Sequence, residues 1–161
     1  MKFTCAPPVA VVLVLALGAA LSSIPAPAAA ATFRVDDSAS LPREGSAVLA
    51  WRDKVPTRDG NDALEGTTSI LFRLDVAAWM NRTARLYLVL PQQAAPITRL
   101  QWRTQGRLQP GQALPGQRVL VYQGPIQSPL LEERLDLVIE ASGTRLQGMQ
   151  SLNLFFEIDL D

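Results

Sequence analysis

The C-terminal stretch from Ser151 to Asp161 constrains the fold more than any other part of this chain. Apolar side chains occupy every second position in it, at Leu152, Leu154, Phe156, Ile158 and Leu160, and polar side chains fill most of the positions between them. A period of two is typical of a β-strand with one apolar and one polar face. We therefore expect a final strand whose apolar face packs against a second sheet.

Burial of that apolar face is large enough to decide whether the chain folds. Full burial of one Leu, Ile or Phe side chain contributes about 1.5–3 kcal/mol, so five of them contribute roughly 7–15 kcal/mol before opposing terms are counted. The net stability of a typical domain is about 5–15 kcal/mol. We therefore expect that the chain cannot fold without its last strand.

Residues 1–31 have the three parts of a secretory signal peptide. Lys2 is their only charged residue, the run from 9 to 21 is unbroken in small and apolar residues, and Ala30 and Ala31 close an alanine-rich end. The apolar run is shorter than the ~20 residues that span a bilayer, which disfavours an uncleaved anchor. We expect cleavage near Ala30 or Ala31, a periplasmic or secreted protein, and no stable membrane span after cleavage.

The mature chain, residues 32–161, would contain neither Cys nor His, because Cys5 leaves with the leader. Loss of Lys2 leaves 14 of the 15 basic residues against 15 acidic ones, a formal charge of −1. This balance gives no reason to expect nucleic acid as a partner. Without disulfides the domain relies on its core alone, which is feasible at a length of about 130 residues.

Alternating or continuous apolar segments follow one another between turns rich in Gly, Pro and polar residues. The expected strands, seven or eight in number, are 32–37, 46–53, 67–76, 83–90, 97–104, 117–123, 130–140 and the final one, with loops at 54–66 and 105–116. No stretch has a convincing helical period. The spacing predicts a single all-β domain, an antiparallel two-sheet β-sandwich of Ig-like architecture. A small closed barrel is the alternative.

The absent residue types exclude most enzyme mechanisms. Without His or Cys the mature chain lacks the groups of a Ser-His-Asp triad, a Cys nucleophile and an ordinary zinc site. Its only Lys, Lys54, lies outside any phosphate-binding glycine motif, and no dinucleotide-binding or nucleophile-elbow motif occurs. The adjacent acidic pairs Asp36-Asp37 and Glu132-Glu133 would point to opposite faces of a strand and not converge as a dyad. We expect no catalysis and no cofactor.

One polar loop has oxygen ligands suited to calcium. Asp59, Asn61 and Glu65 lie in it, and calcium prefers such hard donors. The spacing does not complete an EF-hand, because Ile70 occupies the position of the bidentate Glu. A solvated loop is therefore the favoured interpretation, with calcium binding as the alternative.

The three tryptophans have different predicted roles. Trp51 and Trp102 each share a strand face with a Leu, which predicts burial in the core. Trp79 lies in a connection beside Arg82, and an exposed Trp next to an Arg suits contact with a sugar or a peptide. Trp79 could equally close one end of the sandwich. Trp79 and Arg82 are therefore the predicted ligand-binding residues.

These features favour a non-catalytic protein of the cell envelope that acts by protein–protein contact. Leu154 to Asp161 is loosely similar to the C-terminal strand of pilus subunits, which implies a fimbrial subunit or an accessory of one. An exposed sheet edge would then pair with another envelope protein or with a second copy. A carbohydrate- or small-ligand-binding module and a structural or inhibitory domain are the alternatives.

Overall fold

The computed structural model describes residues 31–42, 47–51, 63–92, 96–144 and 152–160, which form ten strands and one short 3₁₀ helix. The strands are β1 (Thr32–Arg34), β2 (Leu41–Pro42), β3 (Ala50–Trp51), β4 (Ala63–Asp75), β5 (Thr83–Val89), β6 (Ile97–Thr104), β7 (Gly111–Ala113), β8 (Arg118–Pro125), β9 (Leu130–Ser142) and β10 (Phe155–Leu160). The helix, η1 (Ala77–Trp79), joins β4 to β5. Among these residues no helix is long and apolar enough to cross a membrane.

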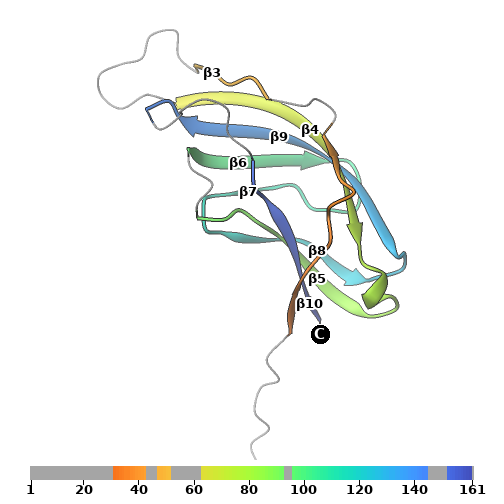
Figure 1. Ribbon diagram of the computed structural model, residues 1–161. Helices are drawn as coiled ribbons and strands as arrows, with labels where there is room; N and C mark the ends of the chain where they lie inside the picture. Colours follow the sequence, from red (N-terminus) through yellow and green to blue (C-terminus); the bar gives the residue numbers. More distant parts are fainter. Residues whose placement is uncertain (1–30, 43–46, 52–62, 93–95, 145–151, 161) are drawn as a thin grey trace, which may run out of the picture.

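The strands form two antiparallel sheets (Figure 1). The first sheet has the order β1-β10-β5-β8, and the second has the order β2-β4-β9-β6-β7 with β3 also paired to β4. Apolar side chains from both sheets join one buried cluster. The prediction of an all-β, antiparallel two-sheet sandwich is therefore confirmed, whereas the Ig-like architecture stays a prediction.

The core is built from the alternating faces that the sequence shows. Along β10, Phe156, Ile158 and Leu160 are buried and face the second sheet, as expected for the final strand. The ring of Phe156 meets the ring of Phe72, which lies on β4 of the other sheet, edge to face at a centroid distance of 5.0 Å. Aromatic pairs in this geometry contribute about 0.5–1.5 kcal/mol beyond their buried area. The last strand thus joins the two layers.

The N-terminal segment changes sheets shortly after β1. Its first part pairs with β10, and a bridge between Asp36 and Asp75 then carries it across to the second sheet, where β2 pairs with β4. The backbone N–H of Asp75 donates to the carbonyl of Asp36 at 2.9 Å, and Val35 is buried beneath the crossing. One short segment thereby contributes an edge strand to each layer.

Two predicted loops contain strands. Residues 63–66, placed in the loop 54–66, belong to β4, because β9 pairs with them as far as Ser142. Gly66 suggested a turn, yet a Cβ at this position would meet the Val48 backbone carbonyl at 2.7 Å. That glycine allows a close backbone approach. Likewise Gly111–Ala113, placed in the loop 105–116, pairs with β6 as β7.

The prediction for Trp51 is wrong, and the prediction for Trp102 is confirmed. Trp102 is 2% exposed, and its indole N–H donates to the backbone carbonyl of Gln109 at 2.9 Å. Trp51 is 50% exposed, because it lies in β3, which is at the margin of the sheet beside Leu64. Of the expected strand 46–53 the structure describes residues 47–51, and only Ala50 and Trp51 among them are in a strand. A Leu at the alternate position therefore does not place a Trp in the core when the strand has only one neighbour.

Candidate interaction surface

The outer edge of β1 is an accessible strand edge in the described part of the chain. β1 lies at one end of the strand order of the first sheet, and its three residues are all exposed. Its register on β10 aligns Phe33 with Ile158. Figure 1 shows the start of β1 beside the C-terminal end of β10. An edge strand with an open side presents backbone donors and acceptors to another chain.

The pairing of β1 with β10 determines which backbone N–H and C=O groups of β1 point away from the sheet. The N–H of Val35 donates to the carbonyl of Phe156 at 2.9 Å, so Val35 faces β10 with its backbone groups. Backbone groups alternate in direction along an antiparallel strand, so Phe33 also faces β10 with its N–H and C=O. The N–H and C=O of Thr32 and Arg34 therefore point to the open side. Arg34 is the centre of the available edge.

Phe33 and Trp79 form an aromatic margin beside this edge. Their ring centroids lie 6.0 Å apart with an interplanar angle of 43°, and Phe33 is 43% exposed. Trp79 is half-buried and packs against the core cluster. An added strand could therefore cover the exposed part of Phe33 with an apolar side chain while its backbone pairs with β1.

Trp79 and Arg82, the predicted ligand-binding pair, lie on one tight connection. The N–H of Arg82 donates to the carbonyl of Trp79 at 3.2 Å, and Asn81 between them has φ of 62°. Asn tolerates this left-handed conformation better than most residues. Arg82 is exposed, whereas Trp79 contacts Phe33 and the core. The connection thus brings Trp79 to the margin of β1.

A polar network covers the outer face of the first sheet next to β1. Arg118 on β8 donates from Nη2 to Asp159 at 2.6 Å and from Nε to Glu157 at 2.7 Å, both on β10. Its guanidinium lies 3.6 Å above the ring of Tyr87 on the intervening β5. The hydrogen bond from Arg118 lowers the pKa of Asp159 and raises that of the guanidinium. Desolvation opposes both shifts.

The same face fixes β1 to its neighbour. Thr32 donates to Asp159 at 2.6 Å, and the guanidinium of Arg34 lies 4.5 Å from the centroid of the Phe155 ring. Asp159 is only 7% exposed, so this attachment is shielded from water. No local pattern reveals these partners, because they lie far from one another along the chain.

Most other strand edges in the described residues carry features that hinder pairing. β8 has a register irregularity opposite Leu86 and Tyr87, ends in Pro125, and receives a 2.7 Å hydrogen bond from the N–H of Gln109 at its Val121 carbonyl. β2 contains a proline, and a proline precedes β7. Prolines and bulges are common protections of edge strands. β1 carries none of these.

The predicted calcium ligands are not brought together by the described residues. Asp59 and Asn61 lie outside those residues, and Glu65 lies within β4, aligned with Glu140 of β9. Among the described residues no group of three or more His, Cys, Asp or Glu side chains could hold a metal ion. Calcium binding by this loop therefore stays a prediction.

The acidic pair Glu132-Glu133 diverges as expected. Glu132 is exposed on the outer face, where its Oε1 lies 2.7 Å from Nε of Arg73. Glu133 points inward, is 6% exposed, and accepts hydrogen bonds from the Thr104 hydroxyl at 3.2 Å and from the Arg107 N–H. No local sequence pattern predicts these contacts of Glu133. The contacts make it a structural anchor for the turn that follows β6.

No protein-family model, curated protein or solved structure matches this chain.

Proposed function

We propose that this protein is an exported, non-catalytic component of the cell envelope that binds an extended segment of another protein molecule along the open edge of β1. The outward N–H and C=O of Arg34 supply the backbone hydrogen bonds. The Phe33–Trp79 margin supplies an apolar contact. This mode of recognition is strand addition, in which main-chain bonds give affinity and alternate side chains give specificity.

The observation that carries the proposal is the contrast between β1 and three of the other edge strands. β1 has an open side, exposed residues and an adjacent aromatic pair, whereas β2, β7 and β8 carry or follow features that disfavour pairing. The firm attachment of β1 to β10 through Thr32 and Asp159 supports the same function, because a rigid edge loses less entropy when it pairs.

A fimbrial subunit or an accessory protein of a fimbria is the form of this function that we favour. The support is the loose similarity of the last strand to those of pilus subunits, together with the signal peptide predicted over residues 1–31. The segment that pairs with β1 would then belong to another envelope protein or to a second copy of this chain.

The test is a single proline in the edge strand. Arg34→Pro removes the outward N–H of residue 34 and leaves every β1–β10 backbone bond in place, since Arg34 does not face β10 with its N–H. Proline is tolerated at such edge positions. The mature chain is examined by sedimentation velocity, alone over a wide concentration range and mixed with an extract of the source cell envelope. We expect the wild type to enter a larger species in one of these samples and Arg34→Pro to remain monomeric.

Two variants control this experiment. Arg34→Ala keeps the N–H and loses only the contact with Phe155, so it should assemble like the wild type. Val35→Pro removes a hydrogen bond to β10 and should destabilise the fold, which far-UV circular dichroism would detect. Wild-type protein that stays monomeric in both samples, or Arg34→Pro that assembles normally, contradicts the proposal.

Export is tested separately by fractionation and N-terminal sequencing of the protein from its source cell. A mature chain that begins near Thr32 in the periplasm or the medium is the expected outcome. A full-length chain in the cytoplasm would contradict the proposed location in the cell envelope. It would not bear on the proposed pairing along β1.

A further inference from the structure

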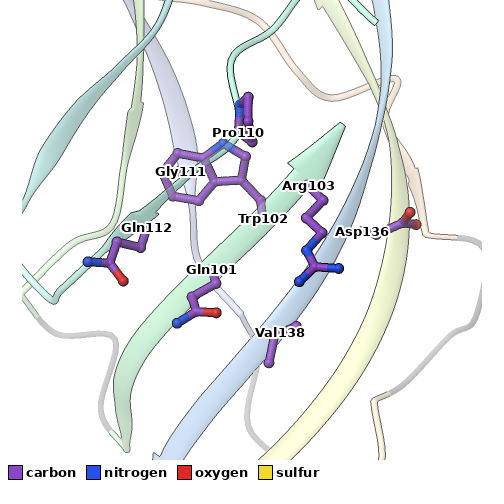
Figure 2. A pocket seen from close by; sticks show the side chains of 8 residues that line it. All are labelled: Gln101, Trp102, Arg103, Pro110, Gly111, Gln112, Asp136 and Val138. Atoms are coloured by element: carbon purple, nitrogen blue, oxygen red, sulfur yellow. The ribbon is translucent and has the colours of Figure 1, made fainter. Parts of the chain in front are cut away.

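A hollow of about 350 Å³ lies on the outer face of the second sheet, over β6 and β9 beside β7. Half of its lining residues have polar side chains, namely Gln101, Arg103, Gln112 and Asp136, and the others are Trp102, Pro110, Gly111 and Val138 (Figure 2). The hollow is open to solvent, so it suits a protruding side chain better than an enclosed small molecule.

Two arginines on this face are matched with acidic residues across neighbouring strands. Arg99 is aligned with Glu140 and forms an ion pair with it. Arg73 is aligned with Glu132, and its Nε lies 2.7 Å from the carboxylate. Both positive charges are therefore satisfied within the sheet.

Arg103 departs from this pattern. Its aligned residue on β9 is Asp136, but Oδ1 of Asp136 accepts a 2.7 Å hydrogen bond from the hydroxyl of Ser69 on β4. Figure 2 shows Asp136 turned away from Arg103, whose guanidinium lies over β9 near Val138. Within the described ranges no carboxylate lies at salt-bridge distance from Arg103, which is exposed in the hollow. The guanidinium retains its donors for a ligand.

We infer that this hollow binds the acidic side chain of a partner polypeptide, with Arg103 as its bidentate anchor. The guanidinium fork matches the two oxygens of a carboxylate. The amides of Gln101 and Gln112 lie in the same lining and can donate further hydrogen bonds. Val138, which is half-buried on this face, would contact the methylene groups of the acidic side chain.

The charges in the hollow favour a carboxylate over a phosphate. One guanidinium and one carboxylate line it, and phosphate carries about two negative charges near neutral pH. The second charge would face Asp136 without a second cation. A singly charged carboxylate needs only Arg103.

The test is an NMR titration of the labelled mature chain with the peptide acetyl-Gly-Glu-Gly-amide. The side-chain amide signals of Gln101 and Gln112 and the Nε signal of Arg103 report on the hollow. We expect a dissociation constant in the millimolar range, because the peptide makes about one charge-assisted contact and the site is open to solvent. The analogous glutamine peptide should give no response, and added salt should weaken the response.

Variants assign the response to the proposed groups. Arg103→Gln should lower the affinity about tenfold or more, whereas Arg134→Gln, which alters an exposed arginine on the same face of β9 outside the hollow, should leave it unchanged. Asp136→Asn should raise the affinity about two- to fivefold, because a nearby negative charge is removed. Unshifted signals elsewhere in each spectrum establish that the variants are folded.

Equal affinity in Arg103→Gln and the wild type overturns the inference. The same peptide with phosphoserine in place of glutamate is titrated for comparison. If it binds more tightly than the glutamate peptide, the assignment to a carboxylate is overturned. A failure here leaves the proposed function intact, because the hollow belongs to the second sheet and β1 to the first.

Discussion

The hydroxyl of Thr32 donates a 2.6 Å hydrogen bond to Oδ1 of Asp159, a residue 127 positions later in the chain. The same carboxylate oxygen accepts a hydrogen bond from Arg118. Thr32 belongs to β1 and Arg118 to β8, which are the two edge strands of the first sheet. A single buried carboxylate on β10 therefore connects both edges of that layer.

Removal of the two partners should have unequal effects on stability. Thr32→Val deletes one hydrogen bond at a similar shape, and we expect a loss of about 0.5–1.5 kcal/mol. Asp159→Ala deletes the acceptor of both bonds and leaves Glu157 as the one carboxylate that accepts from Arg118, so a loss of about 2–3 kcal/mol is expected. Urea unfolding monitored by circular dichroism measures both values. Equal losses in the two variants would contradict the shared role of Asp159.

The lowered pKa of Asp159 predicts loss of stability in acid. The hydrogen bond from Arg118 favours the ionised carboxylate in the folded state, so the folded pKa lies below the ordinary value of 3.8. Its contribution is complete above about pH 5 and fades as the pH falls through 3.8 towards the folded pKa. Unfolding free energies measured between pH 7 and pH 3 should therefore decline more steeply for the wild type than for Asp159→Asn. Parallel declines would show that other carboxylates govern acid unfolding.

Adjacent phenylalanines on β10 offer a matched test of the inter-sheet core. Phe156 is fully buried against Phe72, whereas Phe155 is half-buried on the outer face beneath Arg34. Phe156→Ala should cost about 3–5 kcal/mol, in the range of large core truncations. Phe155→Ala should cost roughly 1–2 kcal/mol, from lost contact area and one cation–π interaction. A larger loss for Phe155→Ala in chemical unfolding would mean that the outer face dominates.

Elements with a sustained period of two were predictable because one buried face dictates both their conformation and their orientation. The strands at 67–76, 130–140 and the C-terminus showed their core faces directly, and the two-layer architecture followed from them. Burial of Phe72, Leu137 and Ile158 agrees with the faces assigned from alternation. In such segments local sequence and tertiary packing impose the same requirement.

Two short edge strands, β2 and β7, were not predictable in the same way. They exist because a neighbouring strand offers open backbone groups, and two or three residues carry no period of their own. The polar partners of Asp159 and Glu133 were also invisible, since each contact joins residues that are far apart in sequence. Of the predicted ligand-binding residues, Trp79 lies at the margin of β1 and Arg82 is exposed beside it.

Glu132 and Glu133 provide the last test, because neighbouring glutamates should differ sharply in their contribution to stability. Glu133 accepts hydrogen bonds from the Thr104 hydroxyl and from the Arg107 N–H, so Glu133→Ala leaves two partly buried donors without their acceptor and should cost about 1–3 kcal/mol. Glu132→Ala removes an exposed ion pair with Arg73 and should cost at most about 1 kcal/mol.

The turn after β6 gives an independent check of the same anchor. A Cβ on Gly106 would collide with the Glu133 carboxylate, so Gly106→Ala must displace that group. We expect Gly106→Ala to lose about 1–3 kcal/mol in the wild-type background and clearly less in the Glu133→Ala background, because the colliding carboxylate is then gone. Urea midpoints of the four proteins measure this coupling. Additive losses would show that Glu133 does not occupy the space beside Gly106.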